Sequence, residues 1–191
     1  MTTLVAYQGK DFAVIGCDSR ATEDGGLFMD LATPKVIKNG DYLIAVSGAS
    51  RGGNIAQFGW TPPKPPKTKN RETLDKFFTK KVIPSLRRAF LDAGYDAKDD
   101  GEAAWQDSNL LIIFNGVVYP VFNDYSWDRE IRNVYFAGSG GELACGALEV
   151  LEITEADTIE DIQAKIYRSI EASCKWSAFS SLPILTFVQR G

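Results

Sequence analysis

Histidine is absent from all 191 residues of the chain. Without an imidazole, neither a Ser-His-Asp triad nor a Cys-His pair can form, and the usual zinc sites, including His-Glu-x-x-His, are excluded as well. If the protein is a hydrolase, its general base must therefore be another group.

Cysteine is scarce, and long apolar runs are lacking. The three cysteines, Cys17, Cys145 and Cys174, are odd in number and far apart, which argues against a disulfide framework or a metal knuckle and fits a reducing cytosol. No apolar run approaches the roughly 20 residues that a membrane span requires, and no basic segment of a signal peptide precedes one. We expect a cytoplasmic protein without a membrane segment, metal or cofactor.

The overall composition is that of a globular protein. Hydrophobic residues make up 45% of the chain and charged residues 24%, with a net charge of −4. A chain of this length predicts one domain, covering residues 1–191. The mildly acidic balance argues against a dedicated nucleic-acid surface, though not against a local basic patch.

Short β-favouring runs occur at both ends and in the middle of the chain. Two pairs flank Asn-Gly turns, Asn39-Gly40 and Asn115-Gly116, which strongly indicate hairpins because both turn residues need positive φ. Pro120 lies in the last run of the second hairpin and favours an edge strand. The predicted strands are 3–7, 12–16, 36–38, 42–46, 110–114, 117–122, 133–137 and 184–188.

Segments between the predicted strands show the periodicity of amphipathic helices. Apolar residues from Leu74 to Phe90 form one stripe, in which Pro84 should cause a kink or a break. Residues 141–152 show a second stripe, and Thr158 with Asp161 resembles a capping box before a third. Residues 61–69 are rich in proline and are interpreted as a loop, with a partner-binding polyproline segment as the alternative; the acidic residues 96–102 are interpreted as a second loop. This order predicts an α+β fold with antiparallel sheets, of which a four-layer αββα sandwich is one arrangement.

The chain terminus offers a base in place of histidine. An α-amino group has a pKa of about 7.7–8.0, near working pH. Thr2 follows Met1, and removal of Met1 would place that amine beside the Thr2 hydroxyl, which it can activate as a nucleophile. Cys17 is an alternative nucleophile, although no base is visible beside it.

Several short motifs accompany this threonine. They are Thr2-Thr3, the run Asp18-Ser19-Arg20-Ala21-Thr22, Thr33-Pro34-Lys35, Val46-Ser47-Gly48 and the glycine-rich 138–141. In this order and spacing, they resemble the proteasome β-subunit family, which includes HslV and consists of N-terminal-nucleophile (Ntn) hydrolases. The resemblance covers most of the chain and is strongest over residues 2–48. It implies the four-layer αββα sandwich.

The resemblance also implies roles for individual residues. Thr2 matches the nucleophile and base, Asp18 the buried acid, and Lys35 the active-site lysine. Gly48 matches the oxyanion donor, through its backbone N–H, and Ser139 matches the serine near the amine. The residues expected to contact a substrate are Ala21, Thr22, Val46 and Ala49.

The chain departs from the family pattern at four places. The spacing from Asp18 to Lys35 is one residue longer than usual, which a loop at Gly25-Gly26 can absorb. Ala49 stands where a second glycine is common after Gly48. No aspartate precedes Ser177 or Ser180, which are the candidates for orienting the amine. The first long helix is interrupted at Gly59 and the proline-rich segment.

Three functions are compatible with these observations. The first is a threonine-type peptidase that cleaves peptides or proteins inside a ring of identical subunits, as the resemblance implies, with an unfoldase partner that the sequence does not identify. The second is a catalytically silent assembly subunit with the same fold. The third is an Ntn amidohydrolase that does not cleave peptides.

Overall fold

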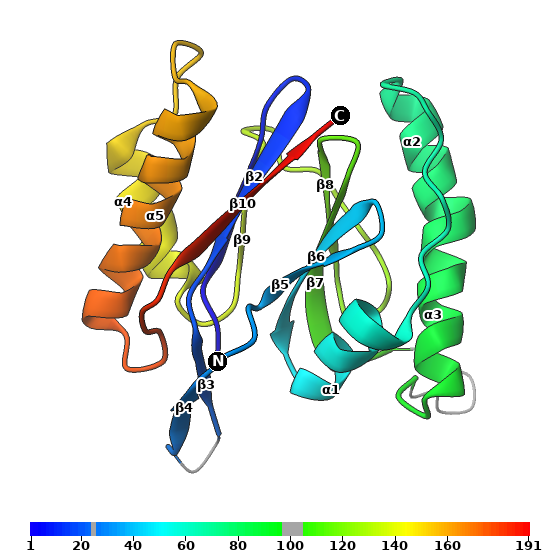
Figure 1. The fold of residues 1–191 in the computed structure, drawn as a ribbon, viewed down its shortest axis with the longest axis horizontal. Coiled ribbons are helices and arrows are strands. Elements are labelled where there is room, and N and C mark those ends of the chain that lie inside the picture. Colours follow the sequence, from blue (N-terminus) through cyan, green and yellow to red (C-terminus); the bar gives the residue numbers. More distant parts are fainter. Residues whose placement is uncertain (24–25, 97–104) are drawn as a thin grey trace.

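A computed structural model describes residues 1–23, 26–96 and 105–191 of the chain. The acidic loop predicted at 96–102 lies outside these residues except for Asp96. The chain folds into antiparallel sheets and helices (Figure 1), so the mixed α and β character predicted from the sequence is confirmed.

The first sheet contains both ends of the chain, in the strand order β10-β2-β1-β9. Strands β1 (Leu4–Gln8) and β2 (Phe12–Cys17) form the first predicted hairpin, in which Val5 pairs with Gly16. Strand β9 (Val134–Ala137) pairs with β1, and the last strand, β10 (Leu185–Arg190), pairs with β2. All neighbouring strands of this sheet are antiparallel.

The second sheet is built from the two Asn-Gly hairpins, in the order β5-β6-β7-β8. Strands β5 (Val36–Asn39) and β6 (Tyr42–Gly48) flank Gly40, whose φ is +60°. Strands β7 (Ser108–Phe114) and β8 (Val117–Val121) flank Asn115 and Gly116, which also have positive φ. Both hairpins are confirmed, and Pro120 lies in an edge strand, where its missing N–H breaks no ladder.

A small two-stranded ribbon extends from the end of β2. It consists of β3 (Arg20–Thr22) and β4 (Phe28–Asp30), which pair through Ala21 and Met29. Strand β4 was not predicted, because its three residues are all exposed and show no alternation of apolar and polar side chains.

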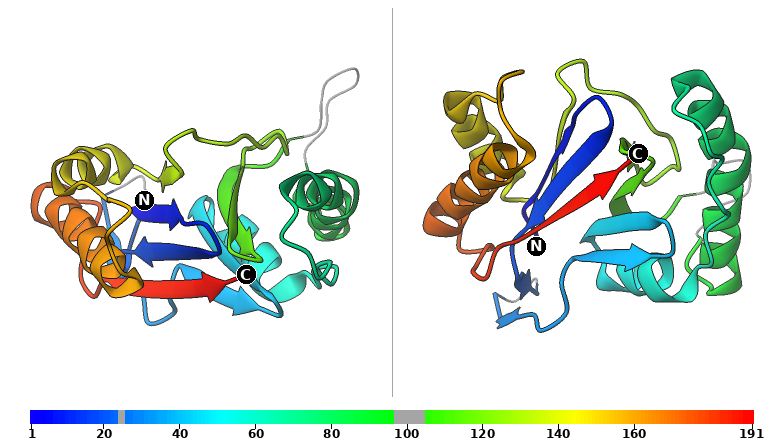
Figure 2. Two further views of the ribbon diagram at one scale, coloured as in Figure 1. Left: turned by 90° about the horizontal axis from the view of Figure 1, so that it is seen from above. Right: turned by 45° about the horizontal axis from the view of Figure 1, so that its top comes forward.

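Two helices cover the outer face of the first sheet (Figures 1 and 2). They are α4 (Gly141–Leu151) and α5 (Ile159–Trp176). The capping box predicted at Thr158 and Asp161 begins α5. Ile162, Ile166 and Ile170 of α5 then pack with the outward side chains of β1 and β2, such as Val5 and Val14, so the predicted stripe is the buried face of the helix.

Helical segments cover the face of the second sheet that points away from the first sheet. Here the apolar stripe from Leu74 to Phe90 faces the sheet, and all its members are buried except Phe77, which is half-buried. Pro84 does not break the helix: a wide π-helical turn, η2, precedes it and joins α2 to α3 without interruption, which accommodates the missing N–H. The segments are α1 (Ser50–Asn54), η1 (Ile55–Gly59), α2 (Arg71–Phe77), η2 (Phe78–Val82) and α3 (Ile83–Asp92).

The two sheets pack on each other through a third apolar cluster, which includes Leu4, Ile15, Ala45 and Leu111. Residues 61–69, which we call the strap, are neither helix nor strand, as predicted. Tyr42 and Asn115 of the second sheet hold the strap through hydrogen bonds to its carbonyl groups. Of the helices in the described ranges, none has the length and apolarity needed to cross a membrane.

Candidate active site

The β1–β2 hairpin brings the start of the chain to Asp18. Leu4 pairs with Cys17, and one step beyond this pair the N–H of Asp18 donates to the carbonyl of Thr3 at 3.2 Å. The N–H of Thr3 donates to Asp18 Oδ1 at 2.7 Å. The register of one hairpin therefore fixes Thr2 and Thr3 beside a carboxylate that is 15 residues distant from Thr3 in sequence.

Asp18 is fully buried and is surrounded by donors. Besides the Thr3 N–H, the backbone N–H groups of Arg20 and Ser181 donate to Oδ2 at 3.0 and 3.3 Å. The ammonium of Lys35 donates to Oδ1 at 2.7 Å. These donors compensate the loss of solvation that a buried carboxylate suffers. Asp18 therefore links Thr3, Arg20, Lys35 and Ser181 through hydrogen bonds.

Lys35 lies just before β5 and points inward, with only 8% of its surface exposed. Its Nζ donates to Asp18 Oδ1, to the carbonyl of Arg20 at 2.5 Å and to the carbonyl of Met1 at 3.1 Å, which uses all three of its N–H donors. Burial lowers the pKa of Lys35, whereas the charge of Asp18 acts in the opposite direction. The ammonium thus bonds to the peptide group that precedes Thr2.

Thr2 is held from its other side by the glycine-rich segment before α4. The N–H of Gly140 donates to the carbonyl of Thr2 at 3.1 Å, and Thr2 is 6% exposed. Gly138 has a φ of +86°, and a Cβ at this position would lie 2.1 Å from the Thr2 carbonyl oxygen. Glycine is therefore required there for the close approach of the two backbones.

A cluster of three buried hydroxyls lies behind the second residue of the Thr-Thr pair. Thr3 Oγ1 is 2.6 Å from Ser180 Oγ and 3.0 Å from Ser173 Oγ, and the two serine hydroxyls are 3.3 Å apart. Ser180 is thus brought to the site, in contact with Thr3. Ser173 was missed by the sequence analysis, although it continues the buried stripe of α5 three residues after Ile170, which is a detectable signal for a polar residue on an inward face.

Two serines named from the resemblance lie apart from this cluster. Ser139 is exposed, and its side chain makes no hydrogen bond with any residue in the described part of the chain. Ser177 is half-buried and accepts a hydrogen bond from the N–H of Phe179 in the turn after α5. In this structure the Ser177 hydroxyl therefore stabilises a turn, and Ser177 meets Ser173 and Ser180 only through backbone hydrogen bonds.

The residues expected to contact a substrate lie on β3 and at the end of β6. Ala21 and Thr22 are half-buried in β3, and the carbonyl of Thr22 accepts a 3.5 Å hydrogen bond from the amino group of Met1. Gly48 ends β6 with a φ of +98° and is exposed. The N–H of the neighbouring Ala49 donates to the carbonyl of Asp107, and the Ala49 carbonyl accepts a hydrogen bond from the Ser108 hydroxyl. Both backbone groups of Ala49 are therefore occupied within the chain.

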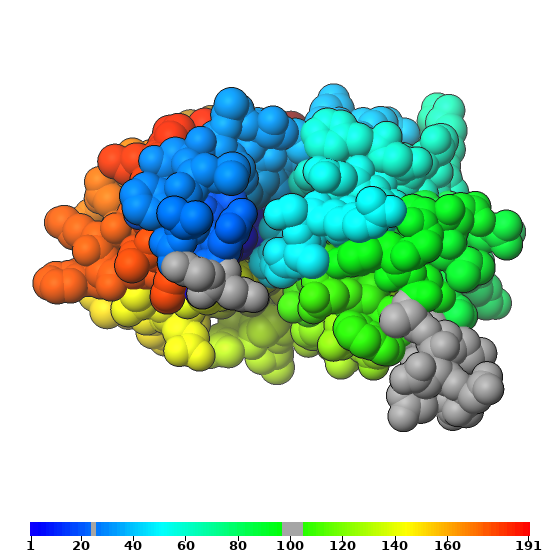
Figure 3. All heavy atoms as spheres, turned by 90° about the horizontal axis from the view of Figure 1, so that it is seen from below, coloured from blue at the N-terminus to red at the C-terminus, as the bar shows by residue number. Residues whose placement is uncertain are grey.

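Val46 packs against the cluster of the second sheet, close to Gly53 of α1. Seen from below, the ribbon of β3 and β4, the segment after α5 and α1 share the face where the chain begins (Figure 3). The elements that carry the candidate residues therefore meet at one end of the two sheets.

Cys17 is a poor alternative nucleophile. It is fully buried, and this burial raises its pKa to about 11. A thiol of that pKa is almost entirely protonated at neutral pH and is weakly nucleophilic. Among the described residues, no group of three or more His, Cys, Asp and Glu side chains could hold a metal ion.

Comparisons with known proteins give a structural likeness only. No protein-family model and no curated protein sequence matches the chain. Among solved structures, BPH of Thiobacillus denitrificans in complex with epoxomicin is 20% identical, with a TM-score of 0.74 over 99% of this chain and 98% of that one. A second structure of Thiobacillus denitrificans BPH has a TM-score of 0.71 at the same identity and coverage. Eukaryotic HslV from Trypanosoma brucei is 16% identical, with a TM-score of 0.62 over 100% of both chains.

Proposed function

We propose that the protein is a threonine-type peptidase in which Thr2, freed of Met1, is both nucleophile and base. The observation that carries the proposal is the position of Lys35, a buried lysine whose ammonium bonds to Asp18 and to the peptide group before Thr2. A buried ion pair adds little net stability compared with apolar packing, so a lysine kept at this point supports a chemical role for its charge beside its structural contacts.

The reaction follows from the groups at hand. The Thr2 amine takes the proton of its own hydroxyl, and the like charge of Lys35 favours the neutral amine that this step needs. Oγ attacks the carbonyl carbon of the substrate, and the Gly48 N–H stabilises the resulting oxyanion; one such donor is worth about 3–4 kcal/mol. The C–N bond breaks as the ammonium of Thr2 returns the proton to the leaving nitrogen, and water, deprotonated by the amine, then hydrolyses the ester.

The substrate is a peptide or unfolded protein bound as an extended strand. Departure of Met1 frees the Thr22 carbonyl, which then accepts from a substrate N–H in the manner of an added strand. Ala21 and Val46 are apolar and line the first specificity pocket, so an apolar residue before the cleaved bond is preferred. Ala49 contacts the substrate through its side chain, beside Gly48, since its own backbone groups are occupied.

The wider assignment rests on the same resemblance. We assign residues 1–191 to a single four-layer αββα sandwich of the Ntn-hydrolase type, with Ser139 and Ser180 near the amine. We further propose that the protein forms ring-shaped homo-oligomers in the cytoplasm and that an unidentified unfoldase delivers substrates to them. The structural likeness to HslV and to an epoxomicin-bound protein supports these points.

The test is to purify the chain, determine its intact mass and N-terminal residue, and measure cleavage of a fluorogenic peptide library. We expect loss of the mass of Met1, turnover by the wild type, and no turnover by Thr2→Ala, with Thr33→Ala as a control of the same chemistry outside the site. Epoxomicin should add its mass to the peptide that begins at Thr2. Turnover by Thr2→Ala at the wild-type rate would refute the proposal.

A silent assembly subunit is the second candidate. It is favoured by the absence of an acid beside Ser177 and Ser180 and by the exposure of Ser139. Retention of Met1 together with no labelling by epoxomicin would support it. Turnover of small amides without any cleavage of peptides would instead indicate an Ntn amidohydrolase.

A further inference from the structure

A groove of about 520 Å³ lies at the end of the first sheet away from Thr2. Its walls are the strap, through residues 64–67, and the last residues of β10, while Tyr42 and Leu43 of β6 lie between them. The strap is held in place because Tyr42 donates its hydroxyl proton to the Pro63 carbonyl at 2.6 Å. The groove is therefore a defined feature of the fold.

The charge of this groove is opposite to that of the whole chain. Four of its lining side chains are basic and one is acidic, which leaves 4 − 1 = +3 in a protein of net charge −4. None of the four basic groups forms an ion pair within residues 1–23, 26–96 and 105–191. The charged lining residues are Lys38, Lys64, Lys67, Arg190 and Asp41.

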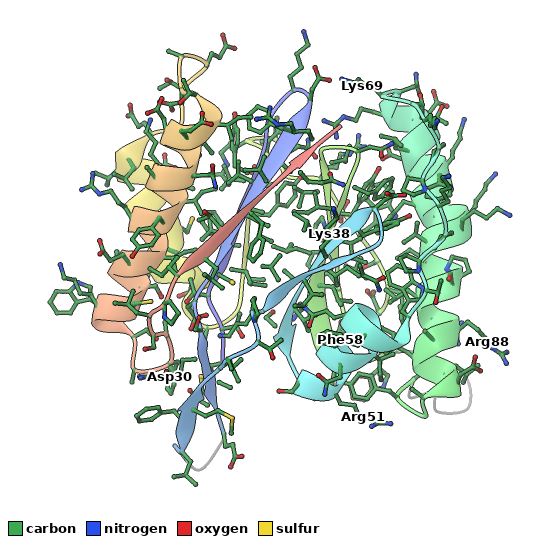
Figure 4. All side chains as sticks on the ribbon, in the orientation of Figure 1. Asp30, Lys38, Arg51, Phe58, Lys69 and Arg88 are labelled. Atoms are coloured by element: carbon green, nitrogen blue, oxygen red, sulfur yellow. The ribbon has the colours of Figure 1, made fainter. Side chains whose placement is uncertain are left out.

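Two labelled lysines locate this basic region in Figure 4. Lys38 lies near the tip of the β5–β6 hairpin, and Lys69, the last residue of the strap, lies near the start of α2. Lys69 is already paired with Asp11 at 3.1 Å. The unpaired charges therefore belong to the groove itself.

One wall of the groove is a strand edge. In the described residues β10 pairs only with β2, so along its other edge the strand offers backbone donors and acceptors to an added strand. Side chains along an extended peptide alternate in direction. A peptide with acidic residues at every second position would therefore present all its carboxylates on one face.

Nucleic acid fits the groove less well. Proteins that bind single strands without reading their sequence stack bases on exposed aromatic rings. The aromatic ring in this groove, that of Tyr42, is 1% exposed and its hydroxyl is engaged with the strap. The groove thus combines positive charge with an open strand edge and lacks a stacking surface.

We infer that this groove binds an acidic polypeptide segment in extended conformation, which adds to the free edge of β10 and places its carboxylates on the strap lysines and Arg190. The groove is separate from the candidate active site. Leu185 of β10 pairs with Cys17, next to Asp18, whereas Arg190 pairs with Phe12, so five strand steps, about 17 Å at 3.4 Å per residue, separate them. The inference is independent of the proposed peptidase activity.

The test measures fluorescence anisotropy of a labelled peptide in which Glu alternates with Val and Thr, titrated with the full chain at low salt. We expect Lys64→Gln/Lys67→Gln to weaken binding about tenfold, a change that corresponds to the loss of two favourable charge contacts. Lys80→Gln/Lys81→Gln is the matched control, because it removes the same charge from an exposed part of η2 outside the groove, and it should change the affinity less than twofold.

Two further probes separate charge from strand addition. The same peptide with Gln for Glu should bind much more weakly, and so should a Glu peptide N-methylated at every residue, which has no N–H left to donate to β10. Equal binding by the two double variants, or by the Gln peptide, would overturn the inference. So would binding of the N-methylated peptide at full strength, or a DNA oligonucleotide that binds in the groove where the acidic peptide does not. Unchanged thermal unfolding of both double variants ensures that folding does not explain a difference.

Discussion

The ammonium of Lys35 lies 2.7 Å from Asp18 Oδ1, and both side chains are almost completely buried. The same carboxylate oxygen accepts the N–H of Thr3, and the same ammonium bonds to the carbonyl of Met1. One ion pair therefore joins the start of the chain to the end of β2 and the beginning of β5. The stability of the fold and the geometry at Thr2 depend on the same two residues.

Asp18→Asn should destabilise the protein by about 3–5 kcal/mol, because it leaves the buried Lys35 ammonium without its counter-charge. Adding Lys35→Met should recover part of this loss, since no unpaired charge then remains. Urea unfolding of the two single variants and the double variant gives the coupling energy. Asp30→Asn serves as control, because the Asp30–Arg20 pair is partly exposed and should be worth less than 1 kcal/mol. Equal losses at Asp18 and Asp30 would contradict the prediction.

Stability should fall as pH rises from about 9 to 11, in part because of Cys17. Burial raises its pKa from 9.0 to about 11, so in this window the unfolded thiol loses its proton while the folded thiol keeps it. The unfolded state then binds fewer protons, and the free energy of unfolding decreases with pH. At about 1.4 kcal/mol per unit, the full contribution is about 2–3 kcal/mol.

The measurement is urea unfolding of the wild type and of Cys17→Ala at several pH values. The variant should lose stability less steeply between pH 9 and 11, whatever its constant cost in packing. Parallel curves for the two proteins would show that Cys17 does not contribute.

Gly140→Ala should destabilise the protein by about 1–3 kcal/mol through overpacking. A methyl group there would lie 1.9 Å from Thr3 Oγ1 and 2.3 Å from Ser173 Oγ. Gly146→Ala, inside the helix α4 that Gly140 precedes as N-cap, is the control, because its Cβ would meet nothing within 4 Å and alanine should stabilise the helix by about 0.5–1 kcal/mol. Thermal unfolding of both variants should show shifts of opposite sign; a shift of the same sign would refute the role of the hydroxyl cluster.

Ser173→Ala should lower kcat of the proposed peptidase several-fold with little change in KM. Ser173 positions Thr3, the neighbour of the nucleophile, and does not line the surface where a peptide would bind. The lost hydrogen bond should also cost about 1 kcal/mol of stability. Ser177→Ala is the control, since the Ser177 hydroxyl bonds only to the N–H of Phe179 in its own turn, and its backbone bonds survive the substitution. If the two variants lose activity equally, the hydroxyl cluster has no special role.

Local signals in the sequence were sufficient for much of the fold. Both Asn-Gly pairs lie at hairpins as predicted. Asn115 and Gly116 both have the expected positive φ, whereas at the first hairpin only Gly40 does, because Asn39 already belongs to β5. Thr158 with Asp161 specifies a helix start through reciprocal hydrogen bonds. In contrast, the exposed ribbon strand β4 carries no periodic pattern and was not predicted. The helix that ends at Gly59 was expected only from the resemblance, since α1, which contains Gly52 and Gly53, shows no periodic pattern either. Pro84 was expected to disturb its helix, but the π-helical turn before it removes the conflict.

The sequence by itself determined the absence of imidazole chemistry, the antiparallel hairpins, and the residue types expected around Thr2. Only the tertiary structure decided which of them meet. Lys35 is buried at Asp18 because β5 packs beside the first hairpin, and Ser173 reaches Thr3 because α5 lies across β1 and β2, whereas Ser139 and Ser177 point elsewhere. Turns and helix caps depend on neighbours within a few residues, but the burial of a charge or a hydroxyl depends on which distant elements pack over it.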